Sequence, residues 1–330
     1  MKLKGKKVLI TGADGFIGSH LTERCIAEGA DVRAFVYYNS FSQWGWLDTV
    51  SKKTLAKHEV FAGDVRDFSC VMEACKDVDV VFHLAALISI PYSYRSPESF
   101  VATNINGTMN ILQSARMLRT KKVIVTSTSE VYGTAQQVPI SELHPINPQS
   151  PYAATKSSAD SLAISYYRSF DVPVSVLRPF NTFGPRQSAR AVIPTVIAQI
   201  LAGQKSIKLG NINATRDLNY VGNTVDAFIR LAETDKGYGD VYNTGSGVEV
   251  SIAEVVEIIQ KILKKKVRIE IDQERLRPAK SEVERLVCDC SKLHRLTGWE
   301  PQLTLEQGLV KTCAWMKDNL KYYKPELYNV

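Results

Sequence analysis

The sequence predicts an α/β fold in which a doubly wound parallel sheet, covered by helices on both faces, precedes a smaller α/β unit. Three observations predict it. Short apolar runs alternate with helix-like segments over the first 180 residues, a glycine-rich turn joins the first run to the first helix, and the alternation loosens after residue 180. Strands that alternate with helices pair in parallel, because each crossover helix returns the chain to the same end of the sheet.

The first half supplies the regular alternation. Short apolar runs predict strands at residues 7–11, 31–37, 59–63, 79–85, 121–125 and 172–178. Helical spacing of apolar residues predicts helices at residues 16–28, about 98–119 and 151–170. In the second half the same patterns predict helices at 190–203 and 251–263, a short strand and a helix within 216–233, and strands at 239–245 and 267–271. The looser order there indicates a smaller unit that is partly interleaved with the first.

The composition is typical of a soluble globular protein, with 45% hydrophobic and 23% charged residues among 330. No apolar run is long enough to span a bilayer and no signal-peptide pattern precedes the first strand, so we expect a cytoplasmic protein. The net charge of +7 lies in short runs such as Lys264–Lys266 without interleaved aromatic residues. That pattern favours solvated helix ends over a nucleic-acid site, and a positive field suits a small anionic substrate. The six cysteines lack zinc-ligand spacing, so we expect free thiols and no metal.

A glycine-rich turn lies between the first strand and the first helix. Gly12, Gly15 and Gly18 in ITGADGFIGSHL allow a tight turn, close approach of a pyrophosphate to the backbone, and close packing of helix on strand. The helix N-terminus then faces the anion. Such strings also mark ordinary turns, but the strand–turn–helix context favours dinucleotide binding. We therefore expect a dinucleotide-binding domain at residues 1–180 and 216–246, and a substrate-binding domain at residues 181–215 and 247–330.

The second predicted strand ends in VYYNS, where a fold that prefers NAD usually has an acid that holds the ribose hydroxyls. Asn39 and Ser40 are the candidate ribose contacts, and a simple turn is the alternative interpretation of these two residues. No carboxylate here would repel a 2′-phosphate, so the sequence is compatible with NAD or NADP.

Tyr152 and Lys156 form a Y-x-x-x-K pair near the start of a predicted helix. Residues four apart lie on the same helix face, and a nearby ammonium group lowers the pKa of a phenol because it favours the phenolate. A phenol with a lowered pKa suits a proton acceptor at neutral pH. The pair also occurs by chance on helix surfaces, but its place after the glycine-rich turn favours the catalytic interpretation.

Together these motifs resemble the extended branch of the short-chain dehydrogenase/reductase superfamily, which has a Rossmann-like fold. The matching motifs are G-x-x-G-x-x-G, Gly63-Asp64-Val65, His83-Leu84-Ala85-Ala86 and Asn104-Ile105-Asn106-Gly107. The resemblance implies cofactor contacts from Phe16, Ile17, Asp64, Val65, Leu84, Ala85, Ala86 and Asn104, with Tyr152 and Lys156. Taken alone, Asp64 is more often a helix N-cap and Asn104 a polar helix position. The family also implies that Thr128 hydrogen-bonds the substrate oxygen, and that NAD or NADP stays bound and is regenerated in each turnover.

The segment TSTSEVYG (126–133) adds a carboxylate that oxidation of a hydroxyl does not need. Glu130 follows the carboxyl end of a parallel strand, where ligands of such sheets bind, and a carboxylate there suits proton abstraction from carbon. The segment resembles nucleotide-sugar 4,6-dehydratases, which implies that Glu130 is the base at sugar C5 and that Ser129 replaces the catalytic Asp of some members.

The same segment leaves alternatives open. UDP-glucuronate decarboxylases carry a similar T-S-E-V-Y-G, and 4-epimerases usually lack the Glu, so a decarboxylase or an epimerase remains possible. A non-catalytic dinucleotide-sensing regulator is an alternative of another class, and the presence of Tyr152 and Lys156 argues against it.

Residues 178–194 (RPFNTFGPRQSARAVIP) resemble the family's nucleotide-sugar segment. The resemblance implies substrate contacts from Ser89, Asn181, Arg186, Arg190, Arg216 and Arg277. Arginine pairs well with phosphate oxygens, although each arginine alone is more often a surface ion-pair residue. PYSY (91–94), PINPQSPYAATK and FGPRQSARAVIPT are similar to dehydratases that begin legionaminic acid synthesis, which implies an NDP-N-acetylglucosamine substrate, GDP before UDP. The family also implies a homodimer formed through helices 98–119 and 151–170. The sequence does not explain Trp44 and Trp46, for which packing is the default interpretation.

Overall fold

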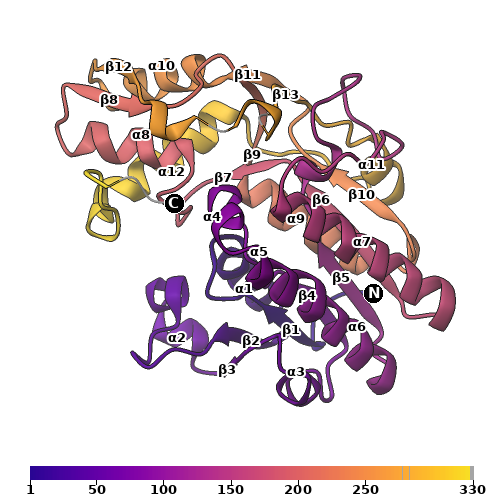
Figure 1. Cartoon of the computed structure of the whole chain (residues 1–330). Helices are drawn as coiled ribbons and strands as arrows, with labels where there is room; N and C mark the ends of the chain where they lie inside the picture. The colour runs from indigo at the N-terminus through magenta and orange to yellow at the C-terminus, as the bar shows by residue number, and fades with distance from the viewer. Residues whose placement is uncertain (277, 282, 328–330) are drawn as a thin grey trace.

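A seven-stranded parallel sheet forms the centre of the first unit (Figure 1). The computed structural model describes residues 1–276, 278–281 and 283–327. The strand order is β10-β6-β5-β4-β1-β2-β3, and every neighbouring pair is parallel. The strands are β1 (Lys7–Thr11), β2 (Asp31–Tyr37), β3 (Glu59–Gly63), β4 (Val80–His83), β5 (Lys122–Thr126), β6 (Val174–Pro179) and β10 (Val241–Thr244). The order reverses between β1 and β4, and in such sheets ligands bind at the carboxyl ends beside that point.

Helices cover both faces of this sheet, because its central strands are apolar on both sides. In β1, Val8 and Ile10 face one core, whereas Leu9 faces the other, as the two-residue period of a strand requires. The first core is closed by α1 (Phe16–Ala27), α9 (Val221–Glu233) and α11 (Ser291–Thr297). The second is closed by α3 (Phe68–Ala74), α6 (Gly107–Leu118) and α7 (Pro151–Phe170). The predicted parallel α/β fold is confirmed.

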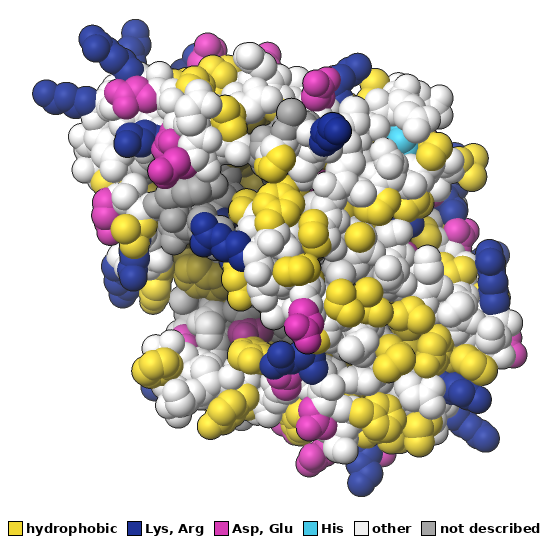
Figure 2. Space-filling model, in the orientation of Figure 1, with side chains coloured by type: hydrophobic (Ala, Val, Ile, Leu, Met, Phe, Trp, Pro, Cys, Tyr) yellow, Lys and Arg dark blue, Asp and Glu magenta, His cyan; other side chains and the backbone are white. Residues whose placement is uncertain are grey.

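The second unit is built on two small sheets and three helices. One sheet has the order β11-β9-β13, with β7 also paired to β9, and the other pairs β12 with β8. The strands are β7 (Asn181–Phe183), β8 (Ser206–Leu209), β9 (Thr215–Tyr220), β11 (Glu249–Ser251), β12 (Arg268–Ile271) and β13 (Arg285–Leu286). The helices α8 (Val192–Leu201), α10 (Ile252–Leu263) and α12 (Leu305–Asp318) enclose its apolar core. Figure 2 shows the surface hollowed between this unit and the α2 side of the first.

Short helical segments complete the chain. They are η1 (Gly45–Thr49), α2 (Lys52–Leu55), α4 (Ile90–Arg95), α5 (Pro97–Phe100), η2 (Val101–Asn106), η3 (Ser129–Tyr132), η4 (Gln273–Arg275), η5 (Ala279–Ser281) and η6 (Leu320–Tyr322). The helix predicted at 98–119 is α5, η2 and α6 in succession, and η2 is a π-helical segment of the kind that often marks functional sites. Within the described part of the chain, no helix is long and apolar enough to cross a bilayer.

The chain crosses between the two units at other places than the sequence indicates. Strand β9 was expected in the first unit, as part of 216–246, but it pairs with β7, β11 and β13 in the second. The chain enters the first unit only with α9. Residues 291–299 make the reverse crossing, since Leu293 and Trp299 lie in the core under α9. Short strands carry little period-2 signal of their own, so their partners cannot be assigned from sequence.

Candidate active site

The glycine-rich turn brings the end of β1, the start of α1 and the end of β4 into close contact. Gly12 has φ 68°, and a Cβ there would lie 2.8 Å from the Ala85 nitrogen. A Cβ on Gly18 would lie 2.0 Å from the Gly12 oxygen. Gly15 is the N-cap of α1 and supplies no side-chain cap, so the first N–H groups of the helix are left for a ligand. This cradle fits a pyrophosphate at a helix N-terminus.

A buried histidine fixes the end of β4 next to this turn. His83 Nδ1 and the Thr11 hydroxyl are 2.8 Å apart, and His83 Nε2 lies 3.1 Å from the Thr108 hydroxyl. The Thr11 hydroxyl also accepts the N–H groups of Leu84 and Ala85, each at 3.1 Å. Burial lowers the pKa of His83 to about 3, so the ring stays neutral and links β1, β4 and α6. The sequence analysis singled out neither Thr11 nor Thr108.

The residues predicted to contact the adenosine end make mostly local bonds. The Asn39 carboxamide oxygen accepts the N–H groups of Phe41 at 3.0 Å and Gln43 at 3.3 Å, which is the turn given as the alternative. Ser40 is exposed beside it. The Asp64 carboxylate takes two bonds from Arg66 Nε, at 3.0 and 2.9 Å.

Asn104 joins the segment after β4 to the helix α7, and both border the site. Its oxygen accepts Leu87 N–H at 2.9 Å, and its nitrogen donates to Leu87 O and to the Thr155 hydroxyl, each at 3.0 Å. The side chain therefore ties the segment after β4, which carries Ala86, to α7. The Asn104 carboxamide already makes three hydrogen bonds within the protein, so any effect of Asn104 on a cofactor acts through the segment after β4 and through α7. Val65 accepts a 2.9 Å bond from Asn110 Nδ2 through its backbone oxygen.

The predicted catalytic residues meet at the carboxyl end of β5. Thr128 precedes η3, and its hydroxyl accepts the Glu130 N–H at 3.2 Å. The Tyr152 phenol, buried on α7, hydrogen-bonds Thr128 and lies within electrostatic range of the Glu130 carboxylate. Ser129 is buried at the start of η3. Lys156, one turn after Tyr152, donates to the Thr126 backbone oxygen at the end of β5. The structure thus brings all five residues together.

The predicted effect of Lys156 on Tyr152 is wrong for the protein alone. Burial raises the pKa of Tyr152, and the negative charges of Glu130 and Asp160 add to that rise, whereas the bond to Thr128 opposes it. The Lys156 ammonium is turned to the Thr126 carbonyl instead. Burial also lowers the pKa of Lys156 to about 8. The desolvation of both groups outweighs the attraction that spacing alone suggested.

A buried ionic network, missed by the sequence analysis, lies behind these residues. Asp160 Oδ2 accepts the Ser127 hydroxyl at 2.7 Å and Arg178 Nε at 2.9 Å. Arg178 Nη1 donates to the Tyr132 hydroxyl at 2.9 Å, which donates to Asn243 Oδ1 at 2.8 Å. The network joins α7, β5, β6 and β10. Its signal was the four-residue spacing that places Asp160 one turn after Lys156 on the same helix face.

The predicted substrate residues lie in different surroundings. Asn181 begins β7, and its Nδ2 is buried without a hydrogen-bond partner among the described residues, as expected of a group that awaits a ligand. Ser89 is buried and caps α4. Arg190 is exposed, and its Nε donates to the Ser188 hydroxyl at 3.1 Å.

The other three predicted arginines differ from one another. Arg186 pairs with Glu23 of α1, with Nη1 and Oε2 2.6 Å apart. Arg216 is buried, and its Nη1 donates to Thr215 O at 2.9 Å. Arg277 lies outside the described residues.

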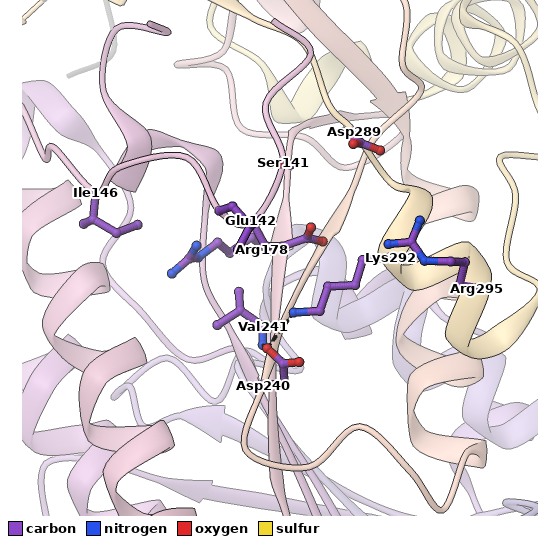
Figure 3. A pocket seen from close by; sticks show the side chains of 10 residues that line it. Ser141, Glu142, Ile146, Arg178, Asp240, Val241, Asp289, Lys292 and Arg295 are labelled. Carbon is purple, nitrogen blue, oxygen red and sulfur yellow. Dashed lines mark hydrogen bonds and ion pairs between the residues drawn. The ribbon is translucent and has the colours of Figure 1, made fainter. Parts of the chain in front are cut away.

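A cavity of about 590 Å³ opens beside the outer strand β10 (Figure 3). It touches the buried network at Arg178. It contains none of the residues predicted to bind cofactor or substrate. The lining residues are Ser141, Glu142, Leu143, Ile146, Arg178, Asp240, Val241, Asp289, Lys292 and Arg295.

Known proteins resemble this chain in both sequence and fold. The sequence model of the GDP-mannose 4,6 dehydratase family matches residues 9–312. A UDP-glucose 4-epimerase of Mycolicibacterium smegmatis is 33% identical over 318 residues, covering 94% of this chain and 99% of that protein. The dTDP-D-glucose 4,6-dehydratase of Homo sapiens is 29% identical over 331 residues, covering 97% and 92%.

Solved structures agree. A Bacillus cereus UDP-glucuronic acid 4-epimerase in complex with UDP-glucuronic acid and NAD has a TM-score of 0.85 and 27% identity, covering 95% of this chain and 99% of that one. A Streptomyces venezuelae dTDP-glucose 4,6-dehydratase with NAD bound has a TM-score of 0.84 and 27% identity, covering 97% and 99%. The chain therefore belongs to the extended short-chain dehydrogenase/reductase family, within the group described by the GDP-mannose 4,6 dehydratase model.

Proposed function

We propose that the protein is an NAD-dependent nucleotide-sugar 4,6-dehydratase whose substrate is an NDP-N-acetylglucosamine, with GDP favoured over UDP. The observation that carries the proposal is the position of Glu130. Its carboxylate acts electrostatically on the Tyr152 phenol, which is bonded to Thr128, at the carboxyl end of β5. Oxidation at C4 needs Tyr152 and Thr128 but not a second acid. A carboxylate beside them suits a step that follows oxidation.

The first step is removal of hydrogen from the sugar C4 carbinol. Tyr152 takes the hydroxyl proton, and Thr128 hydrogen-bonds the C4 oxygen. The Gly12–Gly18 turn and the N-terminus of α1 would hold NAD, which would supply a hydride acceptor and a positive nicotinamide ring that lowers the pKa of nearby acids. Burial and the Glu130 carboxylate keep the phenol protonated in the protein alone. Tyr152 therefore becomes a base only in the assembled complex.

The second step is elimination. A ketone at C4 makes the C5 hydrogen acidic, and Glu130 removes that proton. Hydroxide leaves C6 as water with the proton that Glu130 took from C5. Return of the hydride to C6 would then give an enolate, which takes up one proton at C5. That proton balances the one that Tyr152 removed from the C4 hydroxyl, so the net change is loss of one water and the product is a 4-keto-6-deoxy sugar. The cofactor ends in its starting oxidation state, and none is consumed overall.

Product mass tests the proposal. Purified protein is incubated with GDP- or UDP-N-acetylglucosamine, and we expect loss of one water from the sugar nucleotide by mass spectrometry. Loss of carbon dioxide from UDP-glucuronate, with no water lost from either amino-sugar nucleotide, would identify a decarboxylase instead. An unchanged mass with inverted C4 configuration by NMR would identify a 4-epimerase, the activity named for the relative that is 33% identical.

Glu130→Gln separates the two steps. The amide keeps the size of the side chain but cannot accept the C5 proton, so we expect dehydration to fall by about 100- to 10,000-fold. Oxidation at C4 should continue, and absorbance of reduced cofactor near 340 nm should accumulate with substrate. In deuterated solvent, the wild type should exchange C5 hydrogen and the variant should not. Undiminished exchange in the variant would remove Glu130 from this role.

We also propose a homodimer formed through α6 and α7. Their outer surface carries exposed apolar side chains, including Met109, Met117 and Phe170, and Figure 2 shows hydrophobic patches over the region where Figure 1 places these helices. Light scattering should give twice the chain mass, and Met117→Glu should shift the protein toward monomer.

A further inference from the structure

The segment 184–190, called here the substrate loop, leaves β7 and leads to α8. It contains Arg186, which was expected to hold a substrate phosphate. The loop is fixed by bonds to elements far away in sequence. Three of these bonds join it to α1, the helix whose N-terminus faces the cofactor. Because α1 belongs to the first unit and the loop to the second, these bonds join the two units.

The bonds from α1 reach two consecutive loop residues. His20 Nε2 lies 3.0 Å from Pro185 O. Arg186 Nη1 lies 2.6 Å from Glu23 Oε2 and 3.3 Å from the Ser19 hydroxyl. Ser19, His20 and Glu23 are spaced so that all three lie on one face of the helix.

Arg186 is enclosed rather than open to a ligand. Its side chain is 9% exposed, and its Nη1 is taken up by Glu23 and Ser19. Its backbone φ is 69°, in the left-handed region that a residue with a Cβ adopts only when its surroundings hold it there. The pair with Glu23 is such a constraint.

A further bond leads to the glycine-rich turn by another route. The Tyr323 hydroxyl donates to Gln187 O at 3.0 Å. Tyr323 belongs to an aromatic cluster with Trp46, whose ring centroid lies 6.4 Å from that of Tyr323 and 5.6 Å from that of Trp315. The Trp46 N–H donates to Asp14 O, between Gly12 and Gly15, at 2.9 Å. Trp46 therefore packs between the units and joins the turn to the C-terminal segment.

We propose that Arg186 is a positioning residue: through Glu23 of α1 it fixes the substrate loop against the cofactor-binding helix, and it does not bind the substrate phosphates itself. The proposal rests on the proposed function only because residues 184–190 are taken as the nucleotide-sugar loop. The helix α1, which faces the cofactor, then fixes the conformation of this loop. Displacement of α1 therefore displaces the loop.

Hydrogen exchange of the loop tests the proposal without substrate or turnover. The Gln187 and Ala191 N–H groups bond Gly184 O and Ser188 O, so their exchange reports loop opening. Glu23→Gln should speed exchange of these amides by about 5-fold, the effect of losing one partly exposed ion pair.

The same helix offers a matched control. Glu28 pairs with Arg24 at 2.7 Å, and its side chain is 37% exposed against 38% for Glu23. Glu28→Gln should leave loop exchange unchanged. Equal loop exchange in wild type and Glu23→Gln would overturn the proposal.

Ligand affinity separates positioning from direct binding. If Arg186 acts through Glu23, the variants Glu23→Gln and Arg186→Met should each weaken nucleotide-sugar binding by a similar factor, and the double variant should be no weaker than either. If Arg186 binds phosphate, Glu23→Gln should leave binding unchanged or tighter while Arg186→Met weakens it strongly, and the proposal fails. Product analysis of the wild type judges the dehydratase assignment independently.

Discussion

Gly18 is the position in the cofactor turn where an added methyl group has least room. A Cβ on Gly18 would lie 2.0 Å from Gly12 O and 2.8 Å from Gly12 C. Both atoms are backbone, so no side chain can rotate away. Carbon contacts settle near 3.5 Å, so the start of α1 must move by about 1.5 Å in Gly18→Ala.

Two opposing effects set the change in stability. Overpacking against the backbone costs about 3 kcal/mol, at the upper end of its usual range. Replacing glycine by alanine in a helix stabilises the folded state by about 1 kcal/mol. The net loss is about 2 kcal/mol, which lowers Tm by about 3 °C for a chain of this size. A shift of about 1.5 Å also takes the helix N–H groups out of hydrogen-bonding range of the pyrophosphate. This should weaken NAD binding by about 3 kcal/mol, which is about 100-fold in affinity.

Gly15→Ala is the matched control. Its Cβ would lie 3.2 Å from Gly12 O, and its φ of −82° suits alanine. Loss of a glycine N-cap costs about 1 kcal/mol at most, so Tm should hardly change, while NAD affinity falls because the pyrophosphate approaches this Cα. Calorimetric unfolding and NAD titration of both variants supply the data. An unchanged Tm and NAD affinity in Gly18→Ala, or equal losses of Tm in the two variants, would refute the packing argument.

Two further variants probe the buried polar groups. Lys122 is fully buried in β5, and burial lowers its pKa from 10.5 to about 8. Between these two pKa values the unfolded chain binds one more proton than the folded protein, so the folded state becomes more stable as the pH rises. The free energy of unfolding of wild type should increase by about 2 kcal/mol relative to that of Lys122→Met between pH 7 and 9.5, measured by denaturant unfolding. A difference that does not change with pH would contradict this assignment. Tyr132→Phe removes the hydroxyl between Arg178 and Asn243, and two unpaired buried groups should cost about 2 kcal/mol, or about 3 °C in Tm. A Tm equal to that of wild type would mean that water replaces the hydroxyl.

The strands of the parallel sheet and its long helices in the first half could be predicted because apolar runs and helical spacing alternate there. The short helix α3 was missed. The helix at 151–170 was predicted with the bounds of α7. Proline and serine at its start are strong signals, and its Ser150 side chain accepts the Ala153 N–H at 3.1 Å. The α12 helix was missed, although Thr304 and Gln307 form a capping box there. Its amphipathic face packs on the second unit, so its partners were unknown from sequence.

The position of Tyr152 and Lys156 one turn apart on a buried helix face could be predicted from their spacing, and their catalytic role stays a prediction. Their electrostatics could not, because burial, which sequence does not give, dominates both pKa values. Arg186 shows the same limit. An arginine after a Gly-Pro turn suits a phosphate, but the Glu23 that pairs with it lies 163 residues away in the chain. Long-range partners of charged side chains are fixed by topology rather than by local pattern.

The position of Glu130 gives it two effects of opposite consequence. Its charge raises the pKa of Tyr152 and so opposes proton removal from the C4 hydroxyl. In the mechanism that we propose, the same carboxylate is the base that acts once the ketone exists. A 4-epimerase, which only returns the hydride to C4, would carry the first effect without using the second. In the proposed dehydratase, a later step uses the carboxylate that opposes oxidation, and that step is removal of the C5 proton.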